Sequence, residues 1–262
     1  MCQQIKYEES IQSFRLYGED TGGPFLFVSD HAGRKIPSFL ADLGVSEAAR
    51  SSHIGVDIGI DGVGKFLAKK LSSLLIEQIY SRLVIDCNRA PGHPTSIVEV
   101  SDGVVIVANQ NLSHEERIWR EQTILHPYHA RITQELDKRQ QRCQPTVLIA
   151  LHSFTPIMGG VARPWQVGVL YNRDTRFSTI MLQLLQAESL IVGDNEPYKL
   201  TNDYTIPLHA EKRALPYLEI EIRQDLITSV EGQEEWAQRL SRLLPLAWQA
   251  FQNIYICNFS FE

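Results

Sequence analysis

The sequence predicts an α/β fold, a single domain with a mainly parallel or mixed central sheet flanked by helices. Short runs of bulky apolar residues alternate with amphipathic stretches of ten or more residues, the pattern of strands joined by helical crossovers. The 262 residues suit one large domain, and no linker, repeat or low-complexity tract divides residues 1–262. With 44% hydrophobic and 21% charged residues, the composition is that of a globular protein.

The first half of the chain alternates strand and helix patterns. A buried strand is expected at Phe25–Val28, followed by a helix over residues 57–71, whose apolar residues form one stripe. Residues 83–85 are apolar and predict a second strand. Ser113 opens a capping box with Glu116, so a long polar helix is expected to about residue 142, kinked or split at Pro127.

The second half continues the alternation. Its clearest strand is 147–151, which ends at His152, and its last helix begins with capping residues and reaches about residue 251. Between them the patterns predict two further strands and one helix, at Val167–Tyr171, Tyr217–Ile222 and Thr175–Ala187.

Composition and charge exclude several classes of protein. The net charge of −6, from 25 Lys+Arg and 31 Asp+Glu, argues against partners such as nucleic acid or an anionic membrane. No signal-peptide pattern opens the sequence, and no apolar run approaches the length of a membrane span. The four cysteines contain no C-x-x-C pair, so reduced thiols and a cytoplasmic location are expected.

Polar residues end three of the predicted strands, where a purely structural account does not require them. His31 follows the first strand, His152 follows the strand 147–151, and Glu219 and Glu221 belong to the last strand. Ligands of open α/β sheets lie beyond the carboxyl ends of the strands. Two histidines and carboxylates gathered there predict a mononuclear metal site, with zinc favoured.

The third metal ligand is less clear, because the sequence contains no H-E-x-x-H and no H-x-x-E. Asp57 and His53 are the nearest candidates. Asp57 is preferred because a carboxylate suits a catalytic zinc site, although Asp57 also suits a helix N-cap. A single histidine at a strand end is more often a hydrogen-bonded structural residue, so the pair of histidines makes the case.

A second candidate set follows residues 83–85. Asn88 and Arg89 are followed by Pro91-Gly92, and an arginine there offers a planar fork that can hold a substrate carboxylate. The structural alternatives are a turn residue for Asn88 and a surface cation for Arg89.

Six segments of the chain, in this order and spacing, resemble the N-formylglutamate amidohydrolase family, over about residues 20 to 230. They are Ser29–Gly33, His53–Gly59, Tyr80–Arg89, His126–His129, Leu151–Ser153 and Glu219–Leu226. Segments 193–198 and 202–205 look similar too. The resemblance implies a zinc-exopeptidase-like fold of the carboxypeptidase type. Residues 86–89 also resemble the Asp-Leu-Asn-Arg segment of aspartoacylases, in which the Asn-Arg pair grips the substrate.

The resemblance also implies roles for individual residues. His31 and His152 match the two metal histidines of the zinc-exopeptidase scaffold, but Arg34 stands where that pattern has a glutamate. This departure supports Asp57 as the replacement ligand. Glu221 matches the general base, and Glu219 is its competitor, since both lie on one face of the strand.

The function implied is metal-assisted hydrolysis of an amide, with N-formyl-L-glutamate giving formate and glutamate, a late step of histidine degradation. Zinc is the expected cofactor, and manganese, cobalt or nickel would fit the same ligands. Arg82 or Arg223 is expected to stabilise the oxyanion, while Asn88 and Arg89 hold a substrate carboxylate. His129 and His209 are expected to line the pocket, with helix-surface histidines as the alternative.

Three other functions are compatible with parts of this pattern. A deacylase or carboxypeptidase-like hydrolase of another N-acyl amino acid or small peptide would use the same site. A non-catalytic small-molecule binding protein would explain the missing H-x-x-E. A serine hydrolase is disfavoured because there is no G-x-S-x-G. The sequence makes no prediction of oligomeric state.

Overall fold

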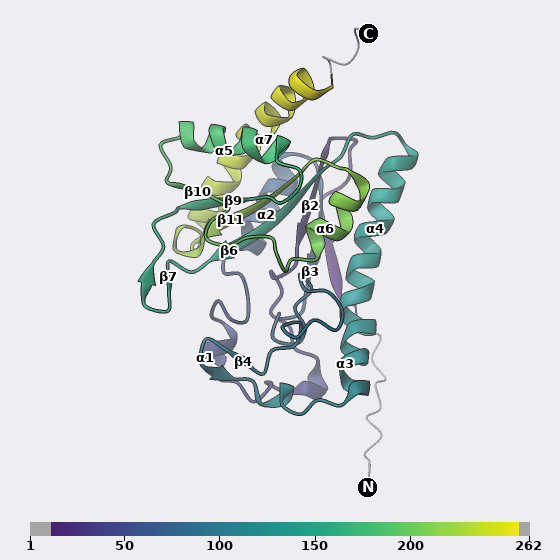
Figure 1. Ribbon diagram of the computed structural model, residues 1–262, viewed down its shortest axis with the longest axis vertical. Coiled ribbons are helices and arrows are strands. Elements are labelled where there is room, and N and C mark those ends of the chain that lie inside the picture. Colours follow the sequence, from purple (N-terminus) through teal and green to yellow (C-terminus); the bar gives the residue numbers. More distant parts are fainter. Residues whose placement is uncertain (1–11, 257–262) are drawn as a thin grey trace.

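Seven strands form a mixed central sheet in the computed structural model, which describes residues 12–256 (Figure 1). Cys2 and Cys257 lie outside this range. The sheet has the order β1-β3-β2-β6-β11-β9-β10. Its strands are β1 (Phe14–Tyr17), β2 (Phe25–Ser29), β3 (Leu74–Gln78), β6 (Val147–Phe154), β9 (Val167–Leu170), β10 (Val192–Asp194) and β11 (Tyr217–Arg223).

The central strands of this sheet are parallel, two pairings nearer its edges are antiparallel, and the edge strand β10 is parallel to β9. β2 is parallel to β3 and β6, and β6 is parallel to β11, whereas β1 and β9 run antiparallel to their neighbours β3 and β11. Two separate hairpins are formed by β4 (Val100–Ser101) with β5 (Val104–Val105) and by β7 (Ile157–Met158) with β8 (Val161–Ala162).

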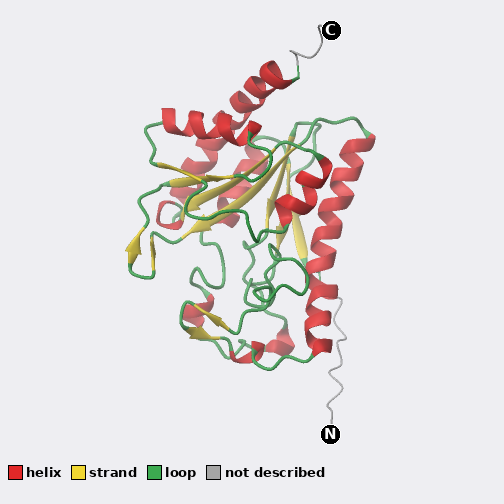
Figure 2. Ribbon diagram, in the orientation of Figure 1, coloured by secondary structure: helices red, strands yellow, loops and turns green. Residues whose placement is uncertain are grey.

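Helices surround the sheet and are joined to it by loops (Figure 2). The α-helices are α1 (Glu47–Arg50), α2 (Ile60–Lys70), α3 (His114–Arg120), α4 (His126–Gln141), α5 (Arg176–Ala187), α6 (Thr205–His209) and α7 (Val230–Tyr255). A π-helical turn, η3 (Glu121–Leu125), joins α3 to α4. Short 3₁₀ turns occur at η1 (Ser38–Leu40), η2 (Val107–Asn109), η4 (Glu211–Arg213) and η5 (Gln224–Leu226).

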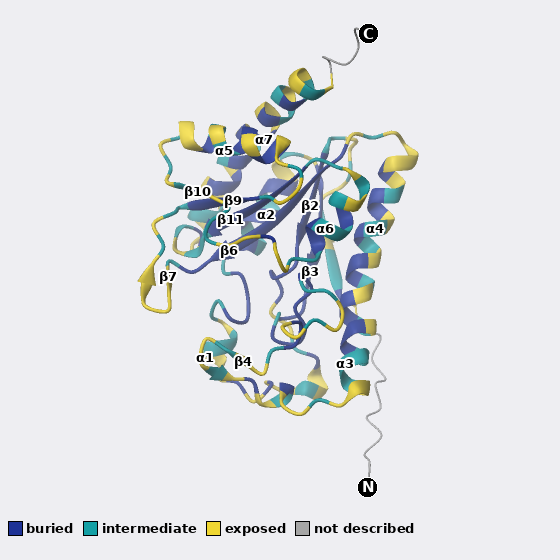
Figure 3. Cartoon of the chain, in the orientation of Figure 1, coloured by how far each residue is buried: buried dark blue, intermediate teal, exposed yellow. Residues whose placement is uncertain are grey.

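Two apolar cores lie on opposite faces of the sheet, because successive residues of a strand point to opposite sides. Phe27 of β2 belongs to the core under α2, α5 and α7, whereas Leu26 and Val28 belong to the core under α4 and α6. β2 and β6 are buried along their whole length, as expected of strands covered on both faces, and Figure 3 shows this. The three layers confirm the predicted α/β fold with a mixed sheet.

The first residues of the helices can be compared with the predicted starts. The capping box of Ser113 and Glu116 is confirmed at the start of α3. The long helix is divided as expected near Pro127, where the π-helical turn ends and α4 begins. α2 starts at Ile60, with Gly59 at its N-cap, so Asp57 is not the capping residue. The side chain of Ser229 caps α7.

The predicted strand at 83–85 is wrong, since these residues form a buried turn and β3 occupies the corresponding place in the sheet. The carbonyl oxygen of Leu83 accepts a hydrogen bond from the Asn109 side chain, and that of Val84 accepts one from Arg120. Side chains therefore satisfy the buried backbone that strand pairing would otherwise satisfy. The sequence predicted neither β3 nor the short strands β1 and β10.

The carboxyl ends of β2, β6 and β11 lie at one edge of the sheet because these strands are mutually parallel. A cavity of about 510 Å³ opens at this edge, with wall residues from the β4–β5 and β7–β8 hairpins and from the segment 198–203. Among the described residues, no helix has the length and apolar character to cross a membrane.

Candidate active site

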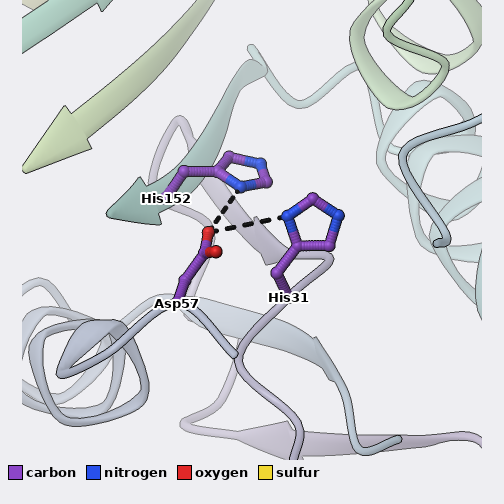
Figure 4. A group of neighbouring side chains, drawn as sticks. All are labelled: His31, Asp57 and His152. Carbon is purple, nitrogen blue, oxygen red and sulfur yellow. Dashed lines mark hydrogen bonds and ion pairs between the residues drawn. The ribbon is translucent and has the colours of Figure 1, made fainter. Parts of the chain in front are cut away.

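Three side chains from separate parts of the chain meet, as Figure 4 shows, and all three line the cavity. His31 lies just beyond β2, His152 is near the end of β6, and Asp57 lies in the loop before α2. Their nearest ligand atoms all lie within 4.8 Å of one another, and all three side chains are buried. The structure thus brings together the three residues that the sequence predicts as metal ligands.

Backbone hydrogen bonds fix Asp57 between the two histidines. The backbone amide of Asp57 donates to the carbonyl oxygen of His31 at 3.0 Å, and that of Ser153 donates to the Asp57 carboxylate at 3.3 Å. Gly59 takes a positive φ of 81° two residues later. A Cβ there would lie 2.0 Å from the carbonyl oxygen of Ile227, so only glycine fits this turn.

The two imidazole rings are oriented in the same way. The Nδ1 atoms of His152 and His31 lie 2.9 Å and 3.6 Å from the same Asp57 oxygen. Each Nε2 atom faces a second carboxylate, at 2.7 Å from Asp86 for His31 and at 3.4 Å from Asp30 for His152. Carboxylates behind metal-binding histidines commonly fix ring orientation in this way.

The donor set fits a divalent cation. His31 Nδ1 is buried without a hydrogen-bond partner, and it points at Asp57 rather than away from it. Two imidazole nitrogens and one carboxylate oxygen are the three protein ligands typical of catalytic zinc, which keeps one position open.

Electrostatics around the three residues favour negatively charged carboxylates. Burial alone would raise the pKa of Asp57, but the neighbouring His31 and His152 outweigh it and hold that pKa below its usual range. The same holds for Asp86, whose pKa is lowered by His31 and Arg82 against the effect of burial.

Glu221 and Glu219 lie side by side in the cavity wall, on one face of β11. Glu221 is paired with His152 in the register of β11 and β6, which sets it next to the three-residue cluster. One carboxylate oxygen of each glutamate is buried without a hydrogen-bond partner. Burial raises the pKa of Glu221 to about 8, and that of Glu219 well above its usual value.

Arg82, Asn88 and Arg89 also lie in the cavity wall. Arg82 donates to Asp86 at 2.7 Å and lies 3.6 Å from Asp57. The side-chain oxygen of Asn88 accepts hydrogen bonds from the backbone amides of Tyr204 and Thr205, which leaves its amide nitrogen to face other groups.

The sequence profile of the N-formylglutamate amidohydrolase family matches residues 23–228, which contain this whole site. The chain belongs to the N-formylglutamate amidohydrolase family. A solved structure of a gene product from Agrobacterium tumefaciens is 32% identical, with 93% of this chain and 97% of that chain covered and a TM-score of 0.88. An N-formylglutamate amidohydrolase from Ralstonia eutropha JMP134 shares the fold, at 20% identity, coverage of 93% and 100%, and a TM-score of 0.73. No curated protein matches the sequence.

Two other residues predicted for the site do not join the three-residue cluster. His53 is in the cavity wall but faces Asp102 at 3.3 Å and does not join the three-residue cluster. Arg223, expected at the oxyanion, lies outside the cavity wall because Asp225, two residues along the chain, binds its guanidinium group through two hydrogen bonds.

His129 and His209 do not line the cavity, contrary to the prediction, nor do they lie on a helix surface. They are 5% and 1% exposed and contact each other behind the cavity wall. The turn that contains Cys87 separates His129 from the cavity. Its neighbours Asp86 and Asn88 line the cavity, and the Cys87 carbonyl oxygen lies 2.8 Å from His129 Nε2.

Sequence reasoning missed four residues of the site. Asp30 and Asp86 support the two histidines, Asp203 forms an ion pair with Arg89 at 2.7 Å, and Tyr198 lies in the cavity wall. For the first two, a signal was present, because Asp30 directly precedes His31 and Asp86 lies two residues before Asn88.

Proposed function

We propose that the protein is a metal-dependent amidohydrolase that cleaves N-formyl-L-glutamate to formate and L-glutamate. The observation that carries the proposal is the meeting of His31, Asp57 and His152 beside Glu221 in one cavity. Membership of the family supports the amide as the bond cleaved. A late step of histidine degradation in the cytoplasm goes with this proposal.

His31, Asp57 and His152 would hold the cation, through two imidazole nitrogens and one carboxylate oxygen. When bound, zinc or a related divalent cation supplies Lewis acidity, which polarises the amide carbonyl and makes water a stronger nucleophile at neutral pH. Asp86 and Asp30 keep the two imidazole rings turned toward Asp57.

Glu221 is the proposed general acid–base. It accepts a proton from the attacking water and delivers that proton to the departing amine nitrogen. Its free, buried carboxylate oxygen supports this role, and so does a pKa near neutrality, about 8, at which both protonation states are accessible. Burial is the main cause of the raised pKa; the positive charges of His152 and His31 act against it, and the negative charges of Asp57 and Asp203 add to it.

Arg89 and Asn88 are the proposed contacts to a substrate carboxylate, and Arg82 is the proposed oxyanion contact. Arg89 donates to Asp203 and to the Asn202 carbonyl oxygen through Nη1, which leaves the other guanidinium nitrogens to bind an anion. Arg82 is the cation nearest to Asp57 and thus to the reacting amide.

Formate release from N-formyl-L-glutamate, with and without a chelator, tests the proposal. Glu221→Gln is expected to lower kcat by about 10²–10⁴-fold while the metal stays bound. His31→Ala is expected to remove both metal and activity. If Glu219→Gln reproduces the loss and Glu221→Gln does not, the base is assigned wrongly.

A panel of other N-formyl, N-acetyl and N-succinyl amino acids and small dipeptides decides the substrate. Turnover of another member alone would keep the mechanism and refute N-formyl-L-glutamate, which corresponds to a related deacylase or carboxypeptidase-like enzyme. A protein that binds no divalent cation when zinc is supplied at neutral pH would refute the metal-dependent mechanism and favour a small-molecule binding protein.

A further inference from the structure

His129 of α4 and His209 of α6 form a buried pair that no step of the proposed reaction uses. His129 Nδ1 lies 2.9 Å from His209 Nε2, and the two rings are stacked with their centroids 5.1 Å apart. The other nitrogen of His129, Nε2, lies 2.8 Å from the carbonyl oxygen of Cys87. The pair therefore ends on the backbone of the residue that precedes Asn88 and Arg89.

The chemistry of these contacts fixes the tautomer of both rings. A carbonyl oxygen only accepts, so His129 Nε2 must carry the proton and donate to Cys87. In a neutral imidazole the other nitrogen then only accepts, so His209 Nε2 must donate to His129 Nδ1. A proton on His129 Nδ1 would set two N–H groups against each other and break the pair.

The surroundings keep both rings neutral. Burial lowers the pKa of His129, and it lowers the pKa of His209 to about 3. The charged and titratable groups that face the pair are Asp30, His126, Lys212 and Arg213. Asp30 favours a positive charge on both rings, and the hydrogen bond to the Cys87 carbonyl favours one on His129, but burial outweighs both effects.

The turn 87–89 is held from its other side as well. The backbone amides of Tyr204 and Thr205 donate to the side-chain oxygen of Asn88, and the Tyr204 ring packs edge-on against His129 at 4.9 Å. The backbone amide of Asn88 in turn donates to the Asp86 carboxylate at 2.9 Å. The His129–Cys87 bond is thus one of a small set of contacts that fix where Asn88 and Arg89 stand in the cavity wall.

We propose that His129 and His209 are positioning residues, which act through the Cys87 carbonyl to set Asn88 and Arg89 for the substrate carboxylate. The inference rests on the proposed function of Asn88 and Arg89. A misplacement of about 1 Å in such a contact can cost about 10²-fold in rate. Loss of the donor at His129 Nε2 also leaves the buried Cys87 carbonyl unsatisfied, which favours movement of the turn.

Two amide variants of His129 separate positioning from mere packing. In His129→Gln the side-chain nitrogen reaches the place of Nε2 and keeps the bond to Cys87, whereas in His129→Asn the shorter side chain cannot. We expect His129→Asn to lower kcat/KM by about 10–100-fold, mainly through KM, and His129→Gln to stay within about threefold of wild type. Gln134→Asn, at an exposed position of the same helix, is the matched control and should have no effect.

A double-mutant cycle tests whether the effect passes through Arg89. If His129 acts by placing that guanidinium, His129→Asn should cost little in an Arg89→Ala background, while zinc affinity stays unchanged in all variants. An equal loss of kcat/KM in both backgrounds, or an equal effect of the Asn and Gln variants, would overturn the proposal. Should His129→Asn fail to fold, a large loss of kcat/KM in folded His129→Gln would overturn it too.

The nitrogen chemical shifts of the two rings test the pair independently of any activity. At pH 7 we expect Nε2–H tautomers for both His129 and His209. A protonated Nδ1 on His129 would overturn the proposal even in an active enzyme. Failure of the wild-type protein to hydrolyse any panel substrate would instead refute the proposed function, and an effect of His129→Asn on glutamate binding would then decide the positioning role.

Discussion

The substitution Asp86→Asn tests how strongly the carboxylate behind His31 supports metal binding. One carboxylate oxygen of Asp86 accepts from His31 Nε2 at 2.7 Å and from the backbone amide of Asn88 at 2.9 Å. The other oxygen accepts from the Arg82 guanidinium at 2.7 Å. An asparagine has one accepting oxygen and an NH₂ group that only donates. It therefore cannot serve both His31 and Arg82, although its shape is the same.

The expected loss follows from these contacts. Loss of a partner behind a metal-binding histidine typically weakens metal affinity by about 10–100-fold. This corresponds to about 1.4–2.8 kcal/mol. A value toward the upper end is expected here, because an NH₂ group turned toward His31 would repel the Nε2–H that the ring needs in order to keep Nδ1 available.

A competition titration of zinc against a chromophoric chelator measures this affinity directly. Asp102→Asn is the matched control, since Asp102 lies in the wall of the same cavity but faces His53. An affinity of Asp86→Asn within twofold of the wild type would refute the view that Asp86 orients a ligand.

Three further predictions concern the substrate contact, the loop that carries Asp57, and acid stability. Arg89→Lys should raise KM for the N-acyl amino acid by at least about tenfold, with less effect on kcat, because a lysine lacks the planar fork. Gly59→Ala should lower the free energy of unfolding, measured by urea denaturation, by more than about 1 kcal/mol, since its Cβ would lie 2.0 Å from the Ile227 carbonyl oxygen. His209, with a folded-state pKa of about 3 against about 6.5 when unfolded, contributes stability that is complete above pH 6.5 and is lost as the pH falls toward 3. The free energy of unfolding should therefore fall by about 2 kcal/mol between pH 6.5 and pH 5. Urea titrations at these two pH values should show this fall in the wild type and not in His209→Asn.

Much of the fold was predictable because its central strands are continuous apolar runs. β2 and β6 are covered on both faces, so their sequences read as uninterrupted hydrophobic segments. The convergence of His31 and His152 was predictable too, since both follow such strands and parallel strands end at the same edge of a sheet. The edge strands β1 and β10 carry no comparable signal.

Other parts of the site depend on contacts between distant segments. His129 follows Pro127 in a polar helix, and nothing local indicates that the ring is buried against His209, 80 residues away. Arg223 lies in a run that resembles the family, yet Asp225 binds its guanidinium group and holds it outside the cavity wall. Local sequence therefore identified residue types that suit the chemistry, but tertiary contacts decide which of them face the cavity.

The wrong strand prediction at 83–85 and the candidate substrate contact at 88–89 have a common physical cause. Residues 83–88 are buried but lie outside the sheet, so their backbone groups are satisfied by separate contacts. Side chains of Asn109, Arg120 and His129 pair with three of the carbonyl groups, and loop backbone pairs with others, such as Ser96 with the Asp86 amide. A strand in this place would alternate its side chains between two faces. The turn instead directs three consecutive residues to different tasks, with Asp86 on His31, the Cys87 carbonyl on His129, and Asn88 in the cavity wall.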